Sequence, residues 1–226
     1  DGYIDIISSS AILDDNVKFF HNNGDGTFTD YTERAKLKGQ MEGLNVVHMD
    51  YNNDGNMDFF IPRGGWKYEA GHLPPSLMRN NGDGTFSDVT IKAGLMNYNP
   101  TQSAEWADVD KDGDVDLFLG HEMGYQSNLY LNNGDETFTD ISHESGIDFK
   151  LYIKGASWGD YNNDGYPDLY ASSFQKPARL YRNDGVKNGK VHFTDVTKEA
   201  GCSGTPSNFP CWWFDYNNDG YDDLYV

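Results

Sequence analysis

Oxygen-bearing side chains recur in four segments that follow the pattern D-x-[DN]-x-D-G-x-x-D. These segments begin at Asp50, Asp108, Asp160 and Asp215. Positions 1, 3, 5 and 9 carry carboxylate or amide oxygens, position 7 can offer its backbone carbonyl, and glycine at position 6 permits a sharp turn. Such a loop can surround a hard cation that needs about six to eight oxygen ligands.

Calcium suits these loops better than the other common metals. Magnesium prefers to keep its waters in a near-ideal octahedron, and the loops contain neither the cysteines nor the paired histidines that favour zinc or copper. The expected ligands, at positions 1, 3, 5, 7 and 9, are Asp50, Asn52, Asp54, Asn56, Asp58; Asp108, Asp110, Asp112, Asp114, Asp116; Asp160, Asn162, Asp164, Tyr166, Asp168; and Asp215, Asn217, Asp219, Tyr221, Asp223. We expect about four Ca2+ ions, bound most tightly in the all-aspartate loop.

A partial fifth loop opens the chain. Asp1, Tyr3 and Asp5 match the back half of the same pattern. We expect residues upstream of the chain to complete this site.

The residues that flank the loops indicate strands. An EF-hand would place glutamate at position 12, between two helices; Ile61, Leu119, Ala171 and Val226 stand there instead. Apolar and aromatic residues follow each ninth-position aspartate directly. The pattern therefore predicts metal loops at the tips of β-hairpins.

A second module follows each loop. It reads FFHNNGDGTFTDYT from Phe19, LMRNNGDGTFSDVT from Leu77, LYLNNGDETFTDIS from Leu129, and LYRNDGVKNGKVHFTDVT from Leu180. Asn-Gly and Asp-Gly between apolar runs favour a tight hairpin turn. Two hairpins per unit, at a spacing of 52–58 residues, predict an all-β protein, a β-propeller built from four-stranded blades.

We interpret residues 1–226 as a single propeller region. Its repeats fall approximately at 1–49, 50–107, 108–159 and 160–214, with a partial repeat at 215–226. Both ends supply the strand that follows a metal loop, so they overlap instead of complementing each other. We therefore expect a segment of a larger propeller; a four-blade ring with frayed ends is the alternative.

Charge and composition exclude several classes of partner. A net charge of −19, with 36 acidic against 17 basic residues, opposes binding to nucleic acid, which needs a basic surface. No run of 18 apolar residues is present, so membrane insertion is not expected. Cys202 and Cys211 could form a disulfide, with two free thiols as the alternative, and their spacing is not that of a metal site.

Aromatic residues recur two positions before the first metal aspartate. His48, Trp106, Trp158 and Trp213 occupy this place. We expect them to pack between blades, and a ring that stacks on a ligand is the alternative. Residues 155–159 match G-x-S-x-G, but a metal loop follows where a nucleophile elbow needs a helix. We expect no catalytic residue and no enzyme activity.

One connection, residues 62–76, is longer than its equivalents in the other repeats. It presents Trp66, Tyr68 and His72, and the equivalent loop at 120–127 presents Tyr125. Exposed loops on a rigid scaffold often carry binding residues. These four aromatic and imidazole side chains form a candidate ligand surface; packing over their own blade is the alternative.

The metal loops, the LYRNNGDGTFTDVT-like segments and the AlaGlyLeu sequence at 93–95 resemble FG-GAP/VCBS repeats. They are most similar to the repeats of ASPIC/UnbV and cartilage-acidic-protein-like proteins, which are related to integrin α-subunit propellers. The resemblance covers nearly the whole chain. It implies a propeller on a secreted or cell-surface protein, although no ASPIC/UnbV or EGF-like module is visible in this sequence.

These observations predict a calcium-binding propeller that is extracellular, at the cell surface or periplasmic. We expect an adhesion or protein-interaction scaffold whose partner is a protein or glycan, with calcium mainly structural and calcium-bridged ligand capture as the alternative. Other candidate functions are a carbohydrate-binding, lectin-like propeller and the scaffold part of a polysaccharide-degrading enzyme. A surface-layer or filament component, self-associating through open blade edges, is a further alternative.

Overall fold

A computed structural model describes residues 2–12, 14–204 and 206–226. Within these residues the protein is almost entirely β-structure, joined by tight turns. Its helical elements are the single-turn helix α1 (Ser142–Ser145) and the 3-10 turn η1 (Tyr68–Gly71). No helix in the described part is long and apolar enough to cross a membrane.

The strands form antiparallel sheets, here called blades 1 to 5, and follow one another in chain order within each blade. Blade 1 contains β1 (Ile6–Ser8), β2 (Lys18–Asn22) and β3 (Phe28–Asp30), and blade 2 contains β4 (Val47–Met49), β5 (Asp58–Ile61), β6 (Ser76–Asn80) and β7 (Phe86–Asp88). Blade 3 contains β8 (Thr101–Ala107), β9 (Asp116–His121), β10 (Asn128–Asn132) and β11 (Phe138–Asp140). Blade 4 contains β12 (Ile153–Gly159), β13 (Asp168–Ser173), β14 (Arg179–Lys187) and β15 (Lys190–Asp195), and blade 5 contains β16 (Trp212–Phe214) and β17 (Asp223–Tyr225).

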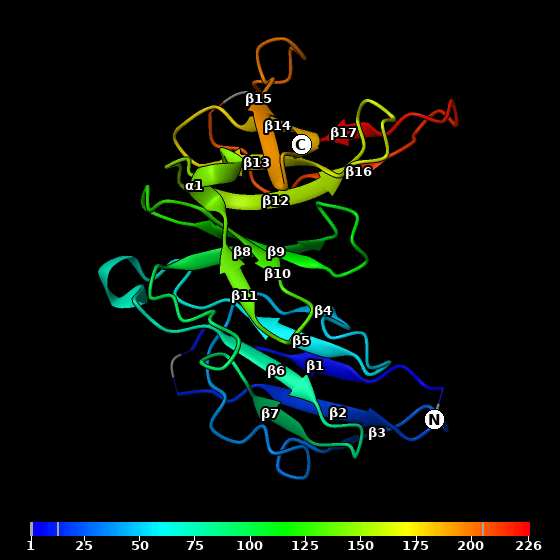
Figure 1. Ribbon diagram of the computed structural model, residues 1–226. Coiled ribbons are helices and arrows are strands. Elements are labelled where there is room, and N and C mark those ends of the chain that lie inside the picture. The colour runs from blue at the N-terminus through cyan, green and yellow to red at the C-terminus, as the bar shows by residue number, and fades with distance from the viewer. Residues whose placement is uncertain (1, 13, 205) are drawn as a thin grey trace.

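The blades stack on one another along the chain (Figure 1). The first strands of neighbouring blades meet, because β8 contacts both β4 and β12, and β12 contacts β16. Adjacent sheets that meet through their innermost strands are the arrangement of a β-propeller. Blades 1 and 5 lie at opposite ends of the stack (Figure 1). The predicted all-β propeller is confirmed: blades 2 to 4 have four strands each, and the described residues supply three strands of blade 1 and two of blade 5.

The hydrophobic core lies between the blades. Phe59 of blade 2 shares a buried cluster with Phe19 of blade 1, Phe60 of blade 2 with Leu119 of blade 3, and Leu169 of blade 4 with Phe118 of blade 3. Strands β5, β9 and β13 are buried at every position because a neighbouring sheet covers each of their faces.

The expected packing of Trp106, Trp158 and Trp213 between blades is confirmed. Each indole lies edge-on to an aromatic ring on the second strand of the preceding blade. His48, at the equivalent position of blade 2, is exposed.

The two ends of each blade carry different loops. Successive hairpins in an antiparallel sheet turn at opposite ends, so the metal loops, between first and second strands, lie at one end, here called the loop end. The connections between second and third strands, including residues 62–75, lie at the other, here called the aromatic end. The turns of the second module return to the loop end, where a Cβ added to Gly134 would meet the Asp114 carboxylate at 2.9 Å.

Candidate metal loops and ligand face

Each complete metal loop folds around its own first aspartate. The Asp108 carboxylate accepts hydrogen bonds from the backbone N–H groups of Asp112 (3.1 Å) and Gly113 (3.0 Å). The loops from Asp50, Asp160 and Asp215 repeat both bonds. Glycine is required at the sixth position because its φ is +97° at Gly113 and similar in the other loops.

The third and fifth positions also turn their oxygens into the loop. Asp110 Oδ1 accepts from the N–H of Asp112 (3.3 Å), and Asp112 Oδ1 accepts from the N–H of Asp114 (2.9 Å). Asn52, Asn162 and Asn217 take the same place as Asp110 in the other loops. At position 7, the N–H groups of Asn56, Tyr166 and Tyr221 bond to the preceding fifth-position carboxylates, as does that of Asp114.

The ninth-position aspartates form the base of the loops. Asp58, Asp116 and Asp168 are buried, and one oxygen of each accepts a backbone N–H from the third strand of its own blade, at Asn80, Asn132 and Asn183. The other oxygen accepts the N–H of the loop's second residue: Tyr51, Val109 or Tyr161. Asp223 makes the second of these contacts, with the N–H of Tyr216.

The negative charge at this place is costly without a cation. Burial, with a smaller contribution from the nearby carboxylates of Asp110 and Asp112, raises the pKa of Asp116 to about 8. Burial likewise raises the pKa of Asp168 to about 7 and that of Asp58 to about 6. Carboxylate oxygens of Asp108, Asp110 and Asp116 lie within 4.8 Å of one another. An all-oxygen donor set with a buried carboxylate at its base fits calcium.

The partial loop at the start of the chain is described from its second residue. Asp1 lies outside the described residues, and the ring of Tyr3 lies against Gly24. Asp5 Oδ1 accepts the N–H of Asn22 at 2.8 Å, the same contact that Asp116 makes with Asn132. Asp5 therefore occupies the place of a ninth-position aspartate.

The sequence interpretation did not identify two residues that join the loops to neighbouring blades. Asn132 donates its side-chain amide to the carbonyl of Tyr51 (2.8 Å), in the loop of blade 2, and Asn183 donates to Val109 (2.8 Å), in the loop of blade 3. The available signal was the asparagine that precedes the turn in every second module.

The four residues of the candidate ligand surface lie at the aromatic end and come from blades 2 and 3. His72 Nε2 lies 3.2 Å from the hydroxyl of Tyr125, and the two rings meet edge-on at 5.4 Å. Tyr68 lines a separate groove of about 430 Å3. The groove also contains Tyr152, Phe174, Gln175 and Lys176, so loops from three blades form it.

Trp66 covers a buried ion pair. The Lys154 ammonium pairs with the Glu122 carboxylate, and both side chains are fully buried. The ammonium lies 3.5 Å from the centre of the Trp66 ring. The backbone N–H of Trp66 donates to the same carboxylate at 2.8 Å, and the Trp66 ring stacks on that of Phe209 with ring centres 5.9 Å apart. These contacts hold an indole that is 47% exposed in one position. Trp66 and Tyr68 both have left-handed backbones, with φ of 68° and 51°.

Comparison with known proteins identifies the family of this chain. The model of the FG-GAP-like repeat matches residues 1–61, 69–119, 108–171 and 160–226. The chain belongs to the FG-GAP-like repeat family. The resemblance expected from the loops and second modules is confirmed.

Curated relatives include cartilage acidic protein 1. The Xenopus tropicalis protein is 26% identical over 176 residues, which cover 74% of this chain and 26% of that protein. The Homo sapiens protein is 25% identical over 190 residues, covering 79% and 28%. This chain thus spans about a quarter of the length of these relatives. A solved structure on recognition of non-reducing terminal N-acetylglucosamine by an Agrocybe aegerita lectin aligns with a TM-score of 0.49 and 17% identity, covering 98% of this chain and 60% of that one.

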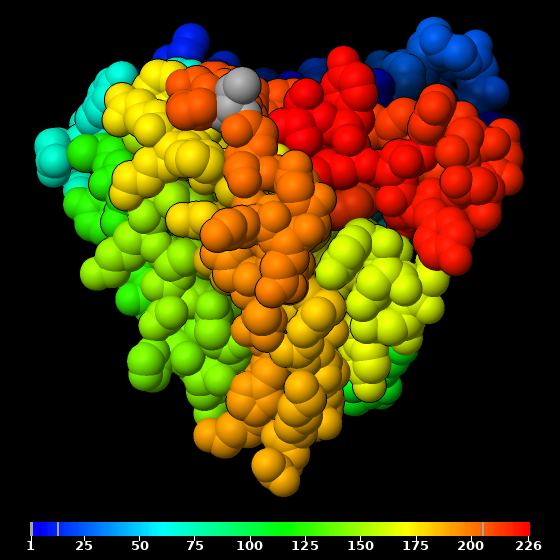
Figure 2. Space-filling model, turned by 90° about the horizontal axis from the view of Figure 1, so that it is seen from above, coloured from blue at the N-terminus to red at the C-terminus, as the bar shows by residue number. Residues whose placement is uncertain are grey.

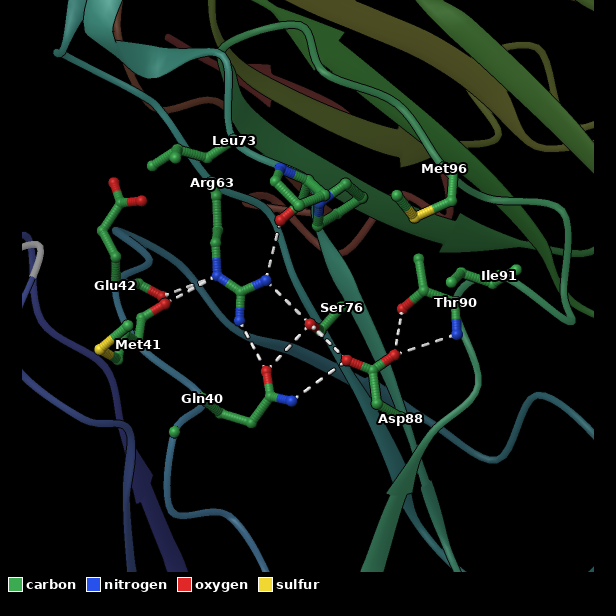
Figure 3. Close-up of a pocket in the computed structure, with 13 residues that line it drawn as sticks. Gln40, Met41, Glu42, Arg63, Leu73, Ser76, Asp88, Thr90, Ile91 and Met96 are labelled. Atoms are coloured by element: carbon green, nitrogen blue, oxygen red, sulfur yellow. Dashed lines mark hydrogen bonds between the residues drawn. The ribbon is translucent and has the colours of Figure 1, made fainter.

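A cleft of about 570 Å3 lies beside the first two FG-GAP-like blades, between residues 39–42 and β6 (Figure 3). Arg63 spans it and donates to the carbonyls of Met41 and Pro74 and to the side chains of Gln40 and Ser76. Its guanidinium joins blade 2 to the segment that leaves blade 1. The candidate ligand residues do not line this cleft.

The disulfide considered for the last FG-GAP-like blades is absent: Cys202 and Cys211 are free thiols. Both lie in the core between blades 4 and 5. The Cys202 thiol points toward the carbonyl of Thr197 (3.8 Å), and that of Cys211 toward the carbonyl of Tyr170 (3.9 Å). Each sulfur therefore has its own backbone acceptor, and the free-thiol alternative is the one that the structure contains.

Proposed function

We propose that this chain is a calcium-stabilised, extracellular β-propeller that serves as an adhesion or protein-interaction scaffold, with a binding role instead of a catalytic one. One observation carries the proposal: the same oxygen-lined loop recurs at the same end of successive blades, with a buried aspartate at its base. The aromatic end is then left free to bind a partner.

Calcium would be held by the oxygens at positions 1, 3, 5, 7 and 9 of each loop. The ion supplies positive charge next to aspartates that are buried or crowded by other carboxylates. The ninth aspartate contacts the first hairpin through its own strand and the third strand through asparagine. A bound ion would therefore hold two hairpins of one blade together. Calcium sites in extracellular modules operate at the high calcium concentrations outside cells.

Thermal unfolding tests this proposal. We expect the melting temperature to rise in millimolar calcium relative to excess chelator, because a ligand that binds only the folded state stabilises it by mass action. Asp112→Ala should reduce the rise, whereas Glu199→Ala, which replaces an exposed acid outside the loops, should leave it unchanged. Equal melting temperatures in calcium and in chelator would contradict the proposal.

Carbohydrate binding is a second candidate, favoured by the groove at the aromatic end. Tyr68, Tyr152 and Phe174 offer aromatic surface in a cavity that also contains the polar side chains of Gln175 and Lys176. Apolar walls with a few placed polar groups are typical of small-ligand sites. A glycan array with calcium present should detect binding that Tyr68→Ala abolishes. Tyr98→Ala, which removes an exposed ring outside the groove, is the control, and binding unaffected by Tyr68→Ala would exclude this groove.

A further inference from the structure

A hydrogen-bonded chain joins the metal loops of blades 2 and 3. Asp58 Oδ2 accepts the N–H of Tyr51 (3.3 Å), and the Tyr51 carbonyl accepts the side-chain amide of Asn132 (2.8 Å). The backbone N–H of Asn132 then donates to Asp116 Oδ1 (2.8 Å). Two ninth-position aspartates from different blades are thereby connected through two residues.

The same chain continues from blade 3 to blade 4. Asp116 Oδ2 accepts the N–H of Val109 (2.8 Å), and the Val109 carbonyl accepts the side-chain amide of Asn183 (2.8 Å). The backbone N–H of Asn183 donates to Asp168 Oδ1 (2.7 Å). Asn132 and Asn183 are 3% and 0% exposed, so water does not compete for these bonds and a displacement of one partner leaves a buried group unsatisfied.

The loops also touch along their outer surface. Asn53 donates to the Asp114 carboxylate in the next loop (2.7 Å), and Lys111 Nζ lies 3.9 Å from the centre of the Tyr166 ring. Asn163 donates to the carbonyl of Gly220 (2.9 Å). Figure 2 shows the yellow-green loop of residues 160–168 against the red loop of residues 215–223. Asn53, Lys111 and Asn163, which make these contacts, are each the fourth residue of their loop and have a positive φ, from 54° to 62°.

We propose that calcium binding at neighbouring loops is positively cooperative, and that Asn132 and Asn183 carry the coupling. Asn132 couples the loops that begin at Asp50 and Asp108, and Asn183 couples those that begin at Asp108 and Asp160. This inference rests on the proposed calcium-binding function.

The sign of the coupling follows from shared ordering. An ion in the loop of Asp50 fixes the Asp58 carboxylate, which accepts the N–H of Tyr51 and so fixes the backbone of Tyr51. That peptide holds the side chain of Asn132, whose N–H positions Asp116 for the next ion. Conformational order imposed by the first ion therefore lowers the ordering cost of the second. Thermodynamic linkage requires the effect to be equal in both directions.

Asn80 offers a matched control. It occupies the equivalent place in blade 2 and donates its N–H to Asp58 at 2.7 Å, as Asn132 does to Asp116. Its side-chain amide donates to the carbonyl of Met57, in the loop of its own blade (3.2 Å). Among the described residues, Asn80 thus reproduces the bonds within a blade without the bond to a preceding metal loop.

The test is a calcium titration of the whole chain, followed by the NMR amide signals of Gly55, Gly113 and Gly165. Each of these N–H groups donates to the first aspartate of its own loop, so each reports one loop. Asp54→Asn, which disables the loop of Asp50, should weaken calcium binding at Gly113 by about fivefold or more, the lower end of typical coupling between sites. Asp219→Asn, in a loop two blades from that of Gly113, should change the calcium affinity at Gly113 by less than about twofold.

Asn132→Ala should abolish the effect of Asp54→Asn on the Gly113 loop, whereas Asn80→Ala should preserve it. If Asn132→Ala does not fold, the Asp54→Asn measurement alone decides whether the two loops are coupled. Calcium binding at all three loops of the unmodified chain, with the affinity of the Gly113 loop unaffected by Asp54→Asn, would overturn the coupling and leave the proposed function standing. Absence of calcium binding in the unmodified chain would overturn both.

Discussion

The indole ring of Trp158 stands edge-on to the phenyl ring of Phe118, with centroids 6.3 Å apart and planes at 85°. Trp158 lies on the first strand of blade 4 and Phe118 on the second strand of blade 3. The same relationship joins Trp106 to Phe60 and Trp213 to Tyr170. One aromatic contact, repeated at each of these interfaces, therefore sets how successive blades meet.

Replacing Trp158 should destabilise the fold strongly. Trp158→Ala removes a large ring from the core between blades 3 and 4, and such losses cost about 3–5 kcal/mol. His48→Ala is the matched control, because His48 holds the same position in blade 2 but is exposed, and its replacement should cost less than about 0.5 kcal/mol. Denaturant unfolding measures both, and equal costs would show that this position does not carry the interface.

The loop of Asp108 should bind calcium more tightly than the loop of Asp160, because it carries aspartate where the other carries Asn162 and Tyr166. Additional carboxylates strengthen calcium binding at comparable geometry. Asp110→Asn should weaken binding at the first loop, and Asn162→Asp should strengthen it at the second. The signals of Gly113 and Gly165 follow the two loops separately; unchanged affinities would show that formal charge does not rank these sites.

Glu105 should make the stability depend on pH near neutrality. Its burial raises the pKa to about 7, and the groups that line the same cavity include Lys154 and Cys211. The unfolded carboxyl titrates near its ordinary pKa, about 4.3. Between these values the folded state binds more protons, so the stability contributed by Glu105 is present at low pH and is lost as the pH rises through about 7.

Glu105→Gln removes that loss. The variant should match the original chain near pH 4 and exceed its stability at pH 8 by about 2 kcal/mol, within the limit set by the pKa difference. Denaturant unfolding at both pH values, with calcium held constant, measures the difference. The same difference at pH 4 and pH 8 would show that Glu105 does not titrate with a raised pKa.

Breaking the buried ion pair should cost more than removing both of its charges. Lys154→Met leaves the Glu122 carboxylate buried without its cation, which typically costs about 3–5 kcal/mol. Lys154→Met combined with Glu122→Gln should regain most of that loss. A double-mutant cycle measured by denaturant unfolding gives the interaction, and additive costs would mean that the two charges do not stabilise each other.

Much of the metal loops could be predicted from sequence, because their contacts are local. The bonds from Asp112 and Gly113 to Asp108 span four and five residues. The motif itself contains the glycine that the turn requires. The ninth aspartate was predicted as a ligand, but its burial and its contact with the third strand were not. Those depend on how the second hairpin folds back against the first.

By itself, the sequence determined the repeats, the hairpins and the all-oxygen loops, since each depends on turn chemistry and alternation within a few tens of residues. Only the tertiary structure decided which blade surfaces meet. Asn132 reaches Tyr51 across 81 positions, Trp66 covers Lys154 from another blade, and the two cysteines bond to different carbonyls instead of to each other. The physical reason is that such contacts follow from the rigid placement of whole sheets by their buried cores, which no local residue pattern specifies.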